Sequence, residues 1–145
     1  MVIAGSFATA EAREARTEMP VTATVMAVAR IERQTAPTEV MVTAADLRRG
    51  YLDVGEPVAL VIRSNSPTGY ALDLDAITPL FSSLVVRGLE SEQSLGADGG
   101  TIVQRWQNAH TAHLTLQFRF VLAPGLTAGR YAWPMQLRVR PLDGI

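Results

Sequence analysis

The chain has 145 residues, of which 48% are hydrophobic and 19% are charged, a composition typical of a folded protein with one hydrophobic core. Its 13 basic residues, all arginine, nearly balance 14 acidic residues, so the basic excess of a nucleic-acid-binding surface is absent. The absence of cysteine and lysine excludes disulfides, thiolate nucleophiles, cysteine-based zinc sites and lysine Schiff bases. No apolar run approaches the roughly 20 residues that span a bilayer as a helix.

The first 19 residues are predicted to lie outside the folded domain. Residues 1–10 are small and apolar, and Ala8-Thr9-Ala10 fits the small-x-small pattern of a signal-peptidase site, although no basic region precedes it. The charged run 11–16 follows directly. We therefore interpret residues 1–19 as either the remainder of an export signal or a disordered tail, and residues 20–145 as a single β-sandwich domain.

Hydrophobic side chains alternate with a period of two from Pro20 onward, which is the spacing of strands with one buried face. The three longest alternating runs cover residues 21–31, 112–122 and 131–139. Because proline cannot donate a ladder hydrogen bond, Pro134 predicts a local irregularity in the last strand. The side chains expected in the core are Leu114, Leu116, Phe118, Phe120, Tyr131, Trp133 and Leu137.

Shorter strands are predicted between these runs, separated by turn sequences rich in glycine, proline and asparagine. Their expected ranges are 39–43, 51–54, 57–64, 69–75, 84–88 and 101–106. Residues 58–62 are apolar on both faces, which predicts a central strand. One helical turn is predicted over residues 43–50, capped by Thr43 and ended by Gly50. Many short strands without a long helix predict an all-β antiparallel sandwich, with a barrel as the competing architecture.

Candidate catalytic and metal-binding groups are few. His110 and His113 lie three residues apart on an alternating strand, where that spacing places side chains on opposite faces, and we interpret them as facing solvent. Asp73 and Asp75 share a face, as the carboxylates of acid–base and calcium sites do, but the solvent face of a hairpin has the same pattern and is favoured. The glycine-rich residues 96–100 precede a strand, which indicates a hairpin turn and not a phosphate loop.

Asp46 and Asp53 flank the predicted helical turn, and we expect both to accept hydrogen bonds from backbone N–H groups. The aromatic residues fall largely at inward positions, which favours core packing over a platform for stacking sugars. No G-x-S-x-G nucleophile motif occurs. We therefore predict no catalytic, cofactor-binding or metal-binding residues, no cofactor, and a protein that is not an enzyme.

Four short motifs follow one another in a characteristic order. They are the alternating N-terminal strand, the turn Asp46-Leu47-Arg48-Arg49-Gly50-Tyr51, the strand end Arg63-Ser64-Asn65-Ser66-Pro67-Thr68-Gly69-Tyr70, and the strand start Gly129-Arg130-Tyr131. This layout, over most of residues 20–141, resembles the pilin-like subunits of bacterial chaperone–usher systems, especially the spore-coat-protein-U-like (archaic) branch. Subunits of that family commonly carry cysteines near the start of the domain, whereas this chain has none.

The resemblance implies an immunoglobulin-like sandwich that lacks its own last strand and is located in the periplasm, on the outer surface or outside the cell. It also implies that a periplasmic chaperone and neighbouring subunits bind by strand exchange. The chain ends about five residues after the strand 131–140, so we expect that strand to have an open edge beside an apolar groove. The expected function is a non-enzymatic structural or assembly subunit of a bacterial surface appendage.

Two sets of partner-binding residues are predicted on this basis. The donor-strand candidates are Val21, Ala23, Val25, Ala27, Ala29 and Ile31, although the same segment could be the domain's own first strand. The open-edge candidates are Tyr131, Trp133, Met135, Leu137 and Val139. Two alternatives stay open: an exported module that recognises carbohydrate or another surface ligand through an exposed aromatic such as Trp106, and a barrel that encloses a small apolar ligand.

Overall fold

The computed structural model describes residues 25–107 and 109–142. In chain order, its elements are β1 (Ala29–Thr35), β2 (Glu39–Val42), α2 (Ala44–Arg49), β3 (Tyr51–Asp53), β4 (Val58–Ser64), β5 (Gly69–Ala76), β6 (Phe81–Arg87), β7 (Gln93–Gly96), β8 (Gly99–Arg105), β9 (Thr111–Leu122), β10 (Gly129–Ala132) and β11 (Met135–Pro141). This order of many short strands around one helical turn confirms the all-β prediction.

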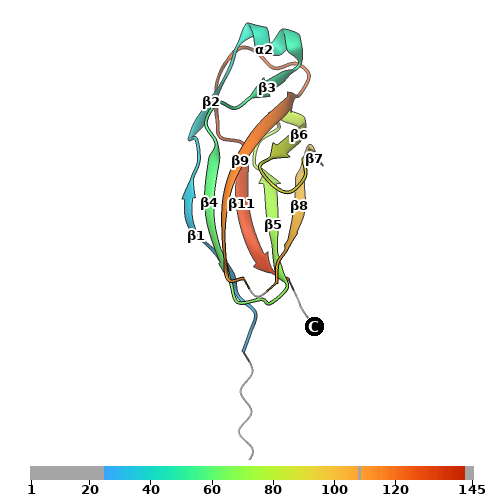
Figure 1. Ribbon diagram of the computed structural model, residues 1–145. Coiled ribbons are helices and arrows are strands. Elements are labelled where there is room, and N and C mark those ends of the chain that lie inside the picture. The colour runs from blue at the N-terminus through green and yellow to red at the C-terminus, as the bar shows by residue number, and fades with distance from the viewer. Residues whose placement is uncertain (1–24, 108, 143–145) are drawn as a thin grey trace, which may run out of the picture.

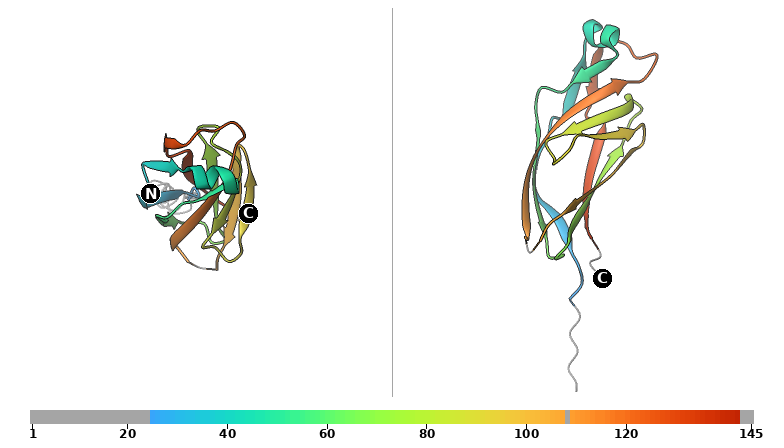
Figure 2. Two further views of the ribbon diagram at one scale, coloured as in Figure 1. Left: turned by 90° about the horizontal axis from the view of Figure 1, so that it is seen from above. Right: turned by 45° about the vertical axis from the view of Figure 1, so that its right-hand side comes forward.

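The strands form a long antiparallel sheet that curls on itself into a nearly closed, elongated sandwich (Figures 1 and 2). The strand order is β1-β4-β9-β6-β7-β8-β5-β11, with β3 also paired to β9. A separate pair, β10-β2, completes the sandwich near α2. As predicted, β4 is central, because it pairs with β1 on one side and with β9 on the other.

The core lies between the layers and is richest in aromatic rings around β9. The period-two pattern of that strand buries Leu116, Phe118 and Phe120, with exposures of 0%, 3% and 0%. The rings of Phe118 and Phe120 both meet the indole of Trp133, at centroid distances of 5.6 and 5.7 Å. Leu137 is also buried. Four of the seven predicted core side chains are therefore buried, whereas Leu114, Tyr131 and Trp133 are only partly buried.

The helical turn α2 begins after Thr43 and ends at Gly50, as its sequence predicts. The Thr43 hydroxyl accepts a hydrogen bond from the Asp46 N–H at 3.2 Å, and the Asp46 carboxylate accepts one from the Thr43 N–H at 2.9 Å. These reciprocal bonds form a capping box and satisfy two N–H groups that the helix leaves unpaired. Gly50 ends the turn at φ 86°, a left-handed conformation that glycine adopts without steric cost.

Two predicted strands differ in the structure. Of the described part of the segment 21–31, residues 25–28 lie outside any strand, and β1 continues instead through polar residues to Thr35. A register shift between Ile31 and Arg33 interrupts its pairing with β4, so the alternation does not continue across the bulge. The last strand is divided at Trp133 and Pro134 into β10 and β11, which confirms the irregularity predicted from the proline.

Candidate functional site

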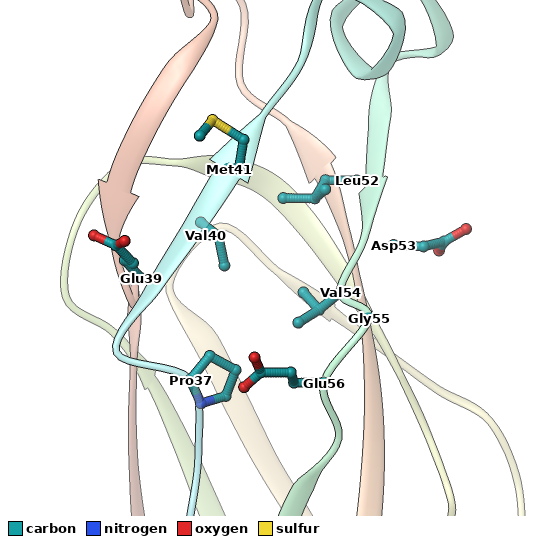
Figure 3. A pocket seen from close by; sticks show the side chains of 9 residues that line it. All are labelled: Pro37, Glu39, Val40, Met41, Leu52, Asp53, Val54, Gly55 and Glu56. Atoms are coloured by element: carbon teal, nitrogen blue, oxygen red, sulfur yellow. The ribbon is translucent and has the colours of Figure 1, made fainter.

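An apolar groove of about 290 Å³ lies between β2 and β3, close to α2. Val40, Leu52 and Val54 line it; they are only 6%, 7% and 9% exposed, and Figure 3 shows their side chains between the two strands. Glu39 and Glu56 also line the groove. The groove therefore has an apolar interior with carboxylates among its lining residues.

The groove exists because β2 and β3, the strands on either side of α2, pair with different partners. β1 pairs with β4, but after Pro37 the chain crosses to the other layer and β2 pairs with β10. The Thr38 carbonyl accepts a hydrogen bond from the Trp133 N–H at 3.0 Å, where this crossing begins. β3 remains paired with β9. The strands on either side of α2 are thus held apart by their own ladders.

The backbone of both strands presents polar groups to the groove. In an antiparallel pair, the backbone N–H and C=O groups of every second residue point to the partner strand. On β2, the bond between Thr38 and Trp133 shows that Thr38 points to β10. The backbone groups of Glu39 and Met41 therefore point away from β10. On β3, the bond from the Val54 N–H to the Phe118 carbonyl (3.0 Å) likewise leaves Asp53 facing away from β9. Within the described residues neither strand has a second ladder partner, so the groove lies between two strand edges.

Arginines neutralise carboxylates beside the groove. Asp53 was expected to cap a backbone N–H group, and that expectation is wrong: its carboxylate accepts hydrogen bonds from Arg119 Nε at 2.6 Å and Nη2 at 3.1 Å. The hydrogen bond from Arg119 lowers the pKa of Asp53 below its usual value. Arg130 forms a similar ion pair with Glu39 at 3.4 Å. Because these charges are paired and the interior is apolar, the groove suits an apolar segment better than a cation.

The donor-strand candidates fall into three groups. Val21 and Ala23 lie outside the described residues. Val25 and Ala27 are exposed, and Val25 reaches 83%. Ala29 and Ile31 are partly buried in β1, where they oppose Ser64 and Ile62 of β4.

The open-edge candidates are distributed over β10, β11 and the break between these two strands. Tyr131 lies in β10 opposite Val40 of β2, and among the described residues β10 has no ladder partner other than β2. Trp133 lies at the break between the strands. The remaining candidates are Met135, Leu137 and Val139 of β11.

The edge of β11 faces β1 with no ladder between the two strands. The bond from the Leu142 N–H to the Gly69 carbonyl shows which residues of β11 bond to β5: the backbone groups of Leu142 and of every second residue before it. The backbone groups of Leu137 and Val139 therefore face away from β5. Cα atoms of β1 and β11 approach within 8 Å, whereas a strand inserted between two others separates them by roughly 9.5 Å. An added strand at this edge would therefore have to displace β1.

Sequence reasoning did not identify the groove between β2 and β3, although one signal was present. Apolar alternation occurs on both sides of the helical turn, as Val40 and Val42 before it and Leu52 and Val54 after it. The connection is much longer than the two to five residues of an ordinary hairpin loop. A long connection leaves two such strands free to pair with other partners.

The groups weighed as catalytic or metal-binding have structural partners or face solvent. Asp73 and Asp75 pair across the outer face with Arg140 and Arg138, at 2.8 and 2.7 Å. His110 and His113 are both exposed. Within residues 25–107 and 109–142, no group of three or more histidine, aspartate or glutamate side chains is placed to hold a metal ion. The glycine-rich residues 96–100 contain the hairpin turn between β7 and β8, as predicted, with Gly96 paired to Gly99.

Trp106 is partly buried and directly follows β8. Its indole Nε1 donates a hydrogen bond to the Ser66 carbonyl at 2.8 Å, and its ring meets that of Tyr70 edge-on at 5.2 Å. It borders an open hollow of about 370 Å³ together with Thr68 and Arg105. These contacts fix the ring in place; carbohydrate recognition there stays a prediction.

Comparisons with known proteins returned no matching family model, no matching curated protein and no matching solved structure. In the part of the chain that the structure describes, no helix has both the length and the apolar composition needed to cross a membrane.

Proposed function

We propose that this chain is a non-enzymatic structural or assembly subunit of a bacterial surface appendage, joined to its neighbours by strand exchange. The observation that carries the proposal is a complementary pair of features in one molecule. An apolar groove lies between two strand edges, and the apolar residues 25–28, which directly precede β1, are exposed outside the core. Extended segments commonly bind proteins by adding a strand to such edges.

The exposed side chains before β1 provide the driving force. Val25, Met26 and Val28 are 83%, 76% and 56% exposed, although each is apolar. Burying a side chain of this size stabilises a complex by about 2 kcal/mol. A strand buries one face in a groove, here either Val25 or the pair Met26 and Val28, so transfer of this segment into a neighbour's groove would contribute about 2–4 kcal/mol. Ladder bonds to Met41 and Asp53 would set its register.

The positions of the two features favour a linear assembly. The groove lies near α2, whereas the N-terminal segment leaves at the opposite end of the elongated sandwich (Figure 1). A segment of one subunit that binds the far end of the next makes a head-to-tail contact. Such contacts build open filaments when the rotation between subunits does not close a ring.

The partners and location follow from the same proposal. A periplasmic chaperone would cover the groove before assembly, and neighbouring subunits would cover it afterwards. The protein would then act in the periplasm, on the outer surface or outside the cell. An unpaired strand edge beside apolar side chains is also an aggregation hazard, which is a physical reason for a dedicated chaperone.

A matched pair of glycine substitutions tests the groove. A Cβ added at Gly55, which lines the groove, or at Gly96 of β7 meets nothing within 4 Å, so both positions accept a side chain. We expect the wild-type chain to form head-to-tail oligomers in light-scattering measurements after gel filtration. Gly55→Trp should reduce that association by at least tenfold, because the indole takes up space that a donor strand needs, whereas Gly96→Trp should associate like wild type.

Two outcomes would contradict the proposal. A wild-type chain that remains monomeric at high concentration, with or without chaperone, has no strand exchange. Equal association of the Gly55→Trp and Gly96→Trp variants would mean that the groove between β2 and β3 is not the acceptor.

A further inference from the structure

The loop between β4 and β5, residues 65–68, holds the chain at the end of the sandwich where the N-terminal segment leaves. Asn65 makes three hydrogen bonds to that segment. Its side-chain Oδ1 accepts from the Val28 N–H at 2.6 Å, its Nδ2 donates to the Met26 carbonyl at 2.9 Å, and its backbone N–H donates to the Val28 carbonyl at 3.1 Å. The segment before β1 is therefore clamped at the carbonyls of Met26 and Val28 and at the Val28 N–H.

The neighbouring serine holds the other end of the chain. The Ser66 hydroxyl donates to the Leu142 carbonyl at 2.7 Å, directly after β11. The Ser66 carbonyl in turn accepts the bond from the Trp106 indole. Asn65 thus projects from a loop that is fixed by bonds to two other segments, and a fixed loop can define the direction of whatever it holds.

The chemistry of the clamp requires an amide. One side chain must accept from an N–H group and donate to a C=O group two residues earlier in the same segment, and the planar carboxamide of asparagine carries both functions side by side. The Asn65 side chain thereby extends the ladder between β1 and β4 beyond Ala29, the residue at which β1 begins. An aspartate could accept but could not donate.

The clamp holds apolar residues in water. Val25, Met26 and Val28 are all more than half exposed, although the domain's own groove is apolar. Stability of the isolated domain does not require that arrangement, because exposed apolar surface is unfavourable. The hydrogen bonds from Asn65 keep the segment extended and away from its own domain, which is the arrangement that binding to a neighbouring subunit needs.

We propose that Asn65 is a positioning residue: it sets the direction in which the N-terminal segment leaves the domain and presents that segment to a neighbouring subunit. The role in assembly rests on the proposed function, whereas the clamp can be measured in the chain by itself. Ordering the backbone of one residue reduces a binding constant by about tenfold, so a segment that is already ordered at residues 26–28 binds more tightly than a free one.

The absence of cysteine makes a direct measurement practical. Cysteines introduced by Val25→Cys and Gln117→Cys, both at exposed positions, give two unique sites for spin labels. Distances between the labels are measured by pulsed electron resonance, with labelled chain diluted in unlabelled chain so that distances between molecules do not contribute. We expect a single narrow distribution in the wild-type background, and at least a twofold broader one for Asn65→Ala.

Two further variants separate the clamp from a general loss of order. Asn65→Asp keeps the bond to the Val28 N–H but loses the donor to Met26, so its distribution should be of intermediate width. Gln34→Ala removes an exposed amide from the other end of β1 and should match wild type. Melting temperatures of all variants should lie within about 4 °C of one another, because exposed hydrogen bonds contribute little to global stability.

Association is measured on the same variants without labels. Asn65→Ala should associate about tenfold more weakly than wild type, and Gln34→Ala should be unchanged. Equal distribution widths in wild type and Asn65→Ala, or a broad distribution already in wild type, would overturn the clamp. If the clamp is measured as expected but wild type does not associate, the proposed function fails and Asn65 has no assembly role.

Discussion

Single residues on the outer face of the β5–β11 pair connect two strands through charge. The Asp73 carboxylate accepts hydrogen bonds from Arg140 Nε at 2.8 Å and from the Thr101 hydroxyl at 2.6 Å. The hydrogen bond from Arg140 is the largest influence on Asp73 and lowers its pKa below the usual value. Asp73 thus links β5 to β8 and β11, and Asp75 links β5 to β11 through Arg138.

This pairing predicts a dependence of stability on acid. A carboxylate with a lowered folded pKa stabilises the fold above its unfolded pKa of about 3.9, and that contribution is lost as the pH falls through the lower, folded value. The free energy of unfolding of wild type should therefore fall more steeply below about pH 4 than that of Asp73→Asn. Urea titrations from pH 6 to pH 2.5 measure both slopes.

A variant that removes only the second donor is the control. Thr101→Val keeps the bond from Arg140, so its slope should lie between those of wild type and Asp73→Asn. Identical slopes for wild type and Asp73→Asn would show that the ion pair is not maintained in solution.

At the scale of elements, β9 organises the fold. It pairs with β3, β4 and β6, and its inward side chains bring Phe118 and Phe120 against Trp133. The outward side chains are polar and exposed, as at Thr115 and Gln117. A strand of this kind combines three ladders with one apolar face, so its two faces should respond very differently to substitution.

Truncation of the buried ring tests that difference. Phe118→Ala should lower the free energy of unfolding by about 3–5 kcal/mol, because it removes a buried ring and leaves a cavity. Gln117→Ala, one residue earlier on the exposed face, should change it by less than about 0.5 kcal/mol. Chemical denaturation monitored by far-ultraviolet circular dichroism measures both values, and a near-neutral Phe118→Ala would refute the assignment of faces.

At the scale of the whole molecule, two of the seams, places where strands of the described residues lie beside each other without a ladder, differ in width. One is the contact between β1 and β11, which is narrow. The other is the groove between β2 and β3, which is open and apolar. The exposed segment before β1 lies outside both seams and is attached to the domain through Asn65. The domain and the segment are therefore separable, which a deletion can test.

Removal of residues 1–28 should leave a folded monomer, because every described strand from β1 onward remains. A peptide of residues 19–31 should then bind the truncated chain. Amide hydrogen exchange measures where it binds: the N–H groups of Glu39, Met41 and Asp53 face the groove and should become protected when a strand is added.

A peptide with Val25→Asp is the matched control, because a charge in the apolar groove is unfavourable. It should give no protection. Protection along β11 instead, at Leu137 and Val139, would show that the acceptor is the other seam and that β1 moves. Loss of folding after the deletion would show that the segment is an integral part of the domain.

Local sequence determined the elements whose causes are local. Period-two alternation predicted β9, the apolar run 58–62 predicted β4 as a central strand, Thr43 and Gly50 predicted the helical turn, and Pro134 predicted the break between β10 and β11. These features depend on residues a few positions apart, so the sequence contains the whole physical reason. The same patterns did not reveal that the strand at 21–31 would begin only at Ala29.

Tertiary structure alone decided where the candidate site lies. The groove depends on β2 leaving the layer of β1 to pair with β10, with Val40 opposite Tyr131, and on β3 remaining with β9. Asn65 meets Met26 and Val28 across nearly forty residues. Strand pairing over such separations follows from how all the apolar faces are buried together, which no local pattern specifies.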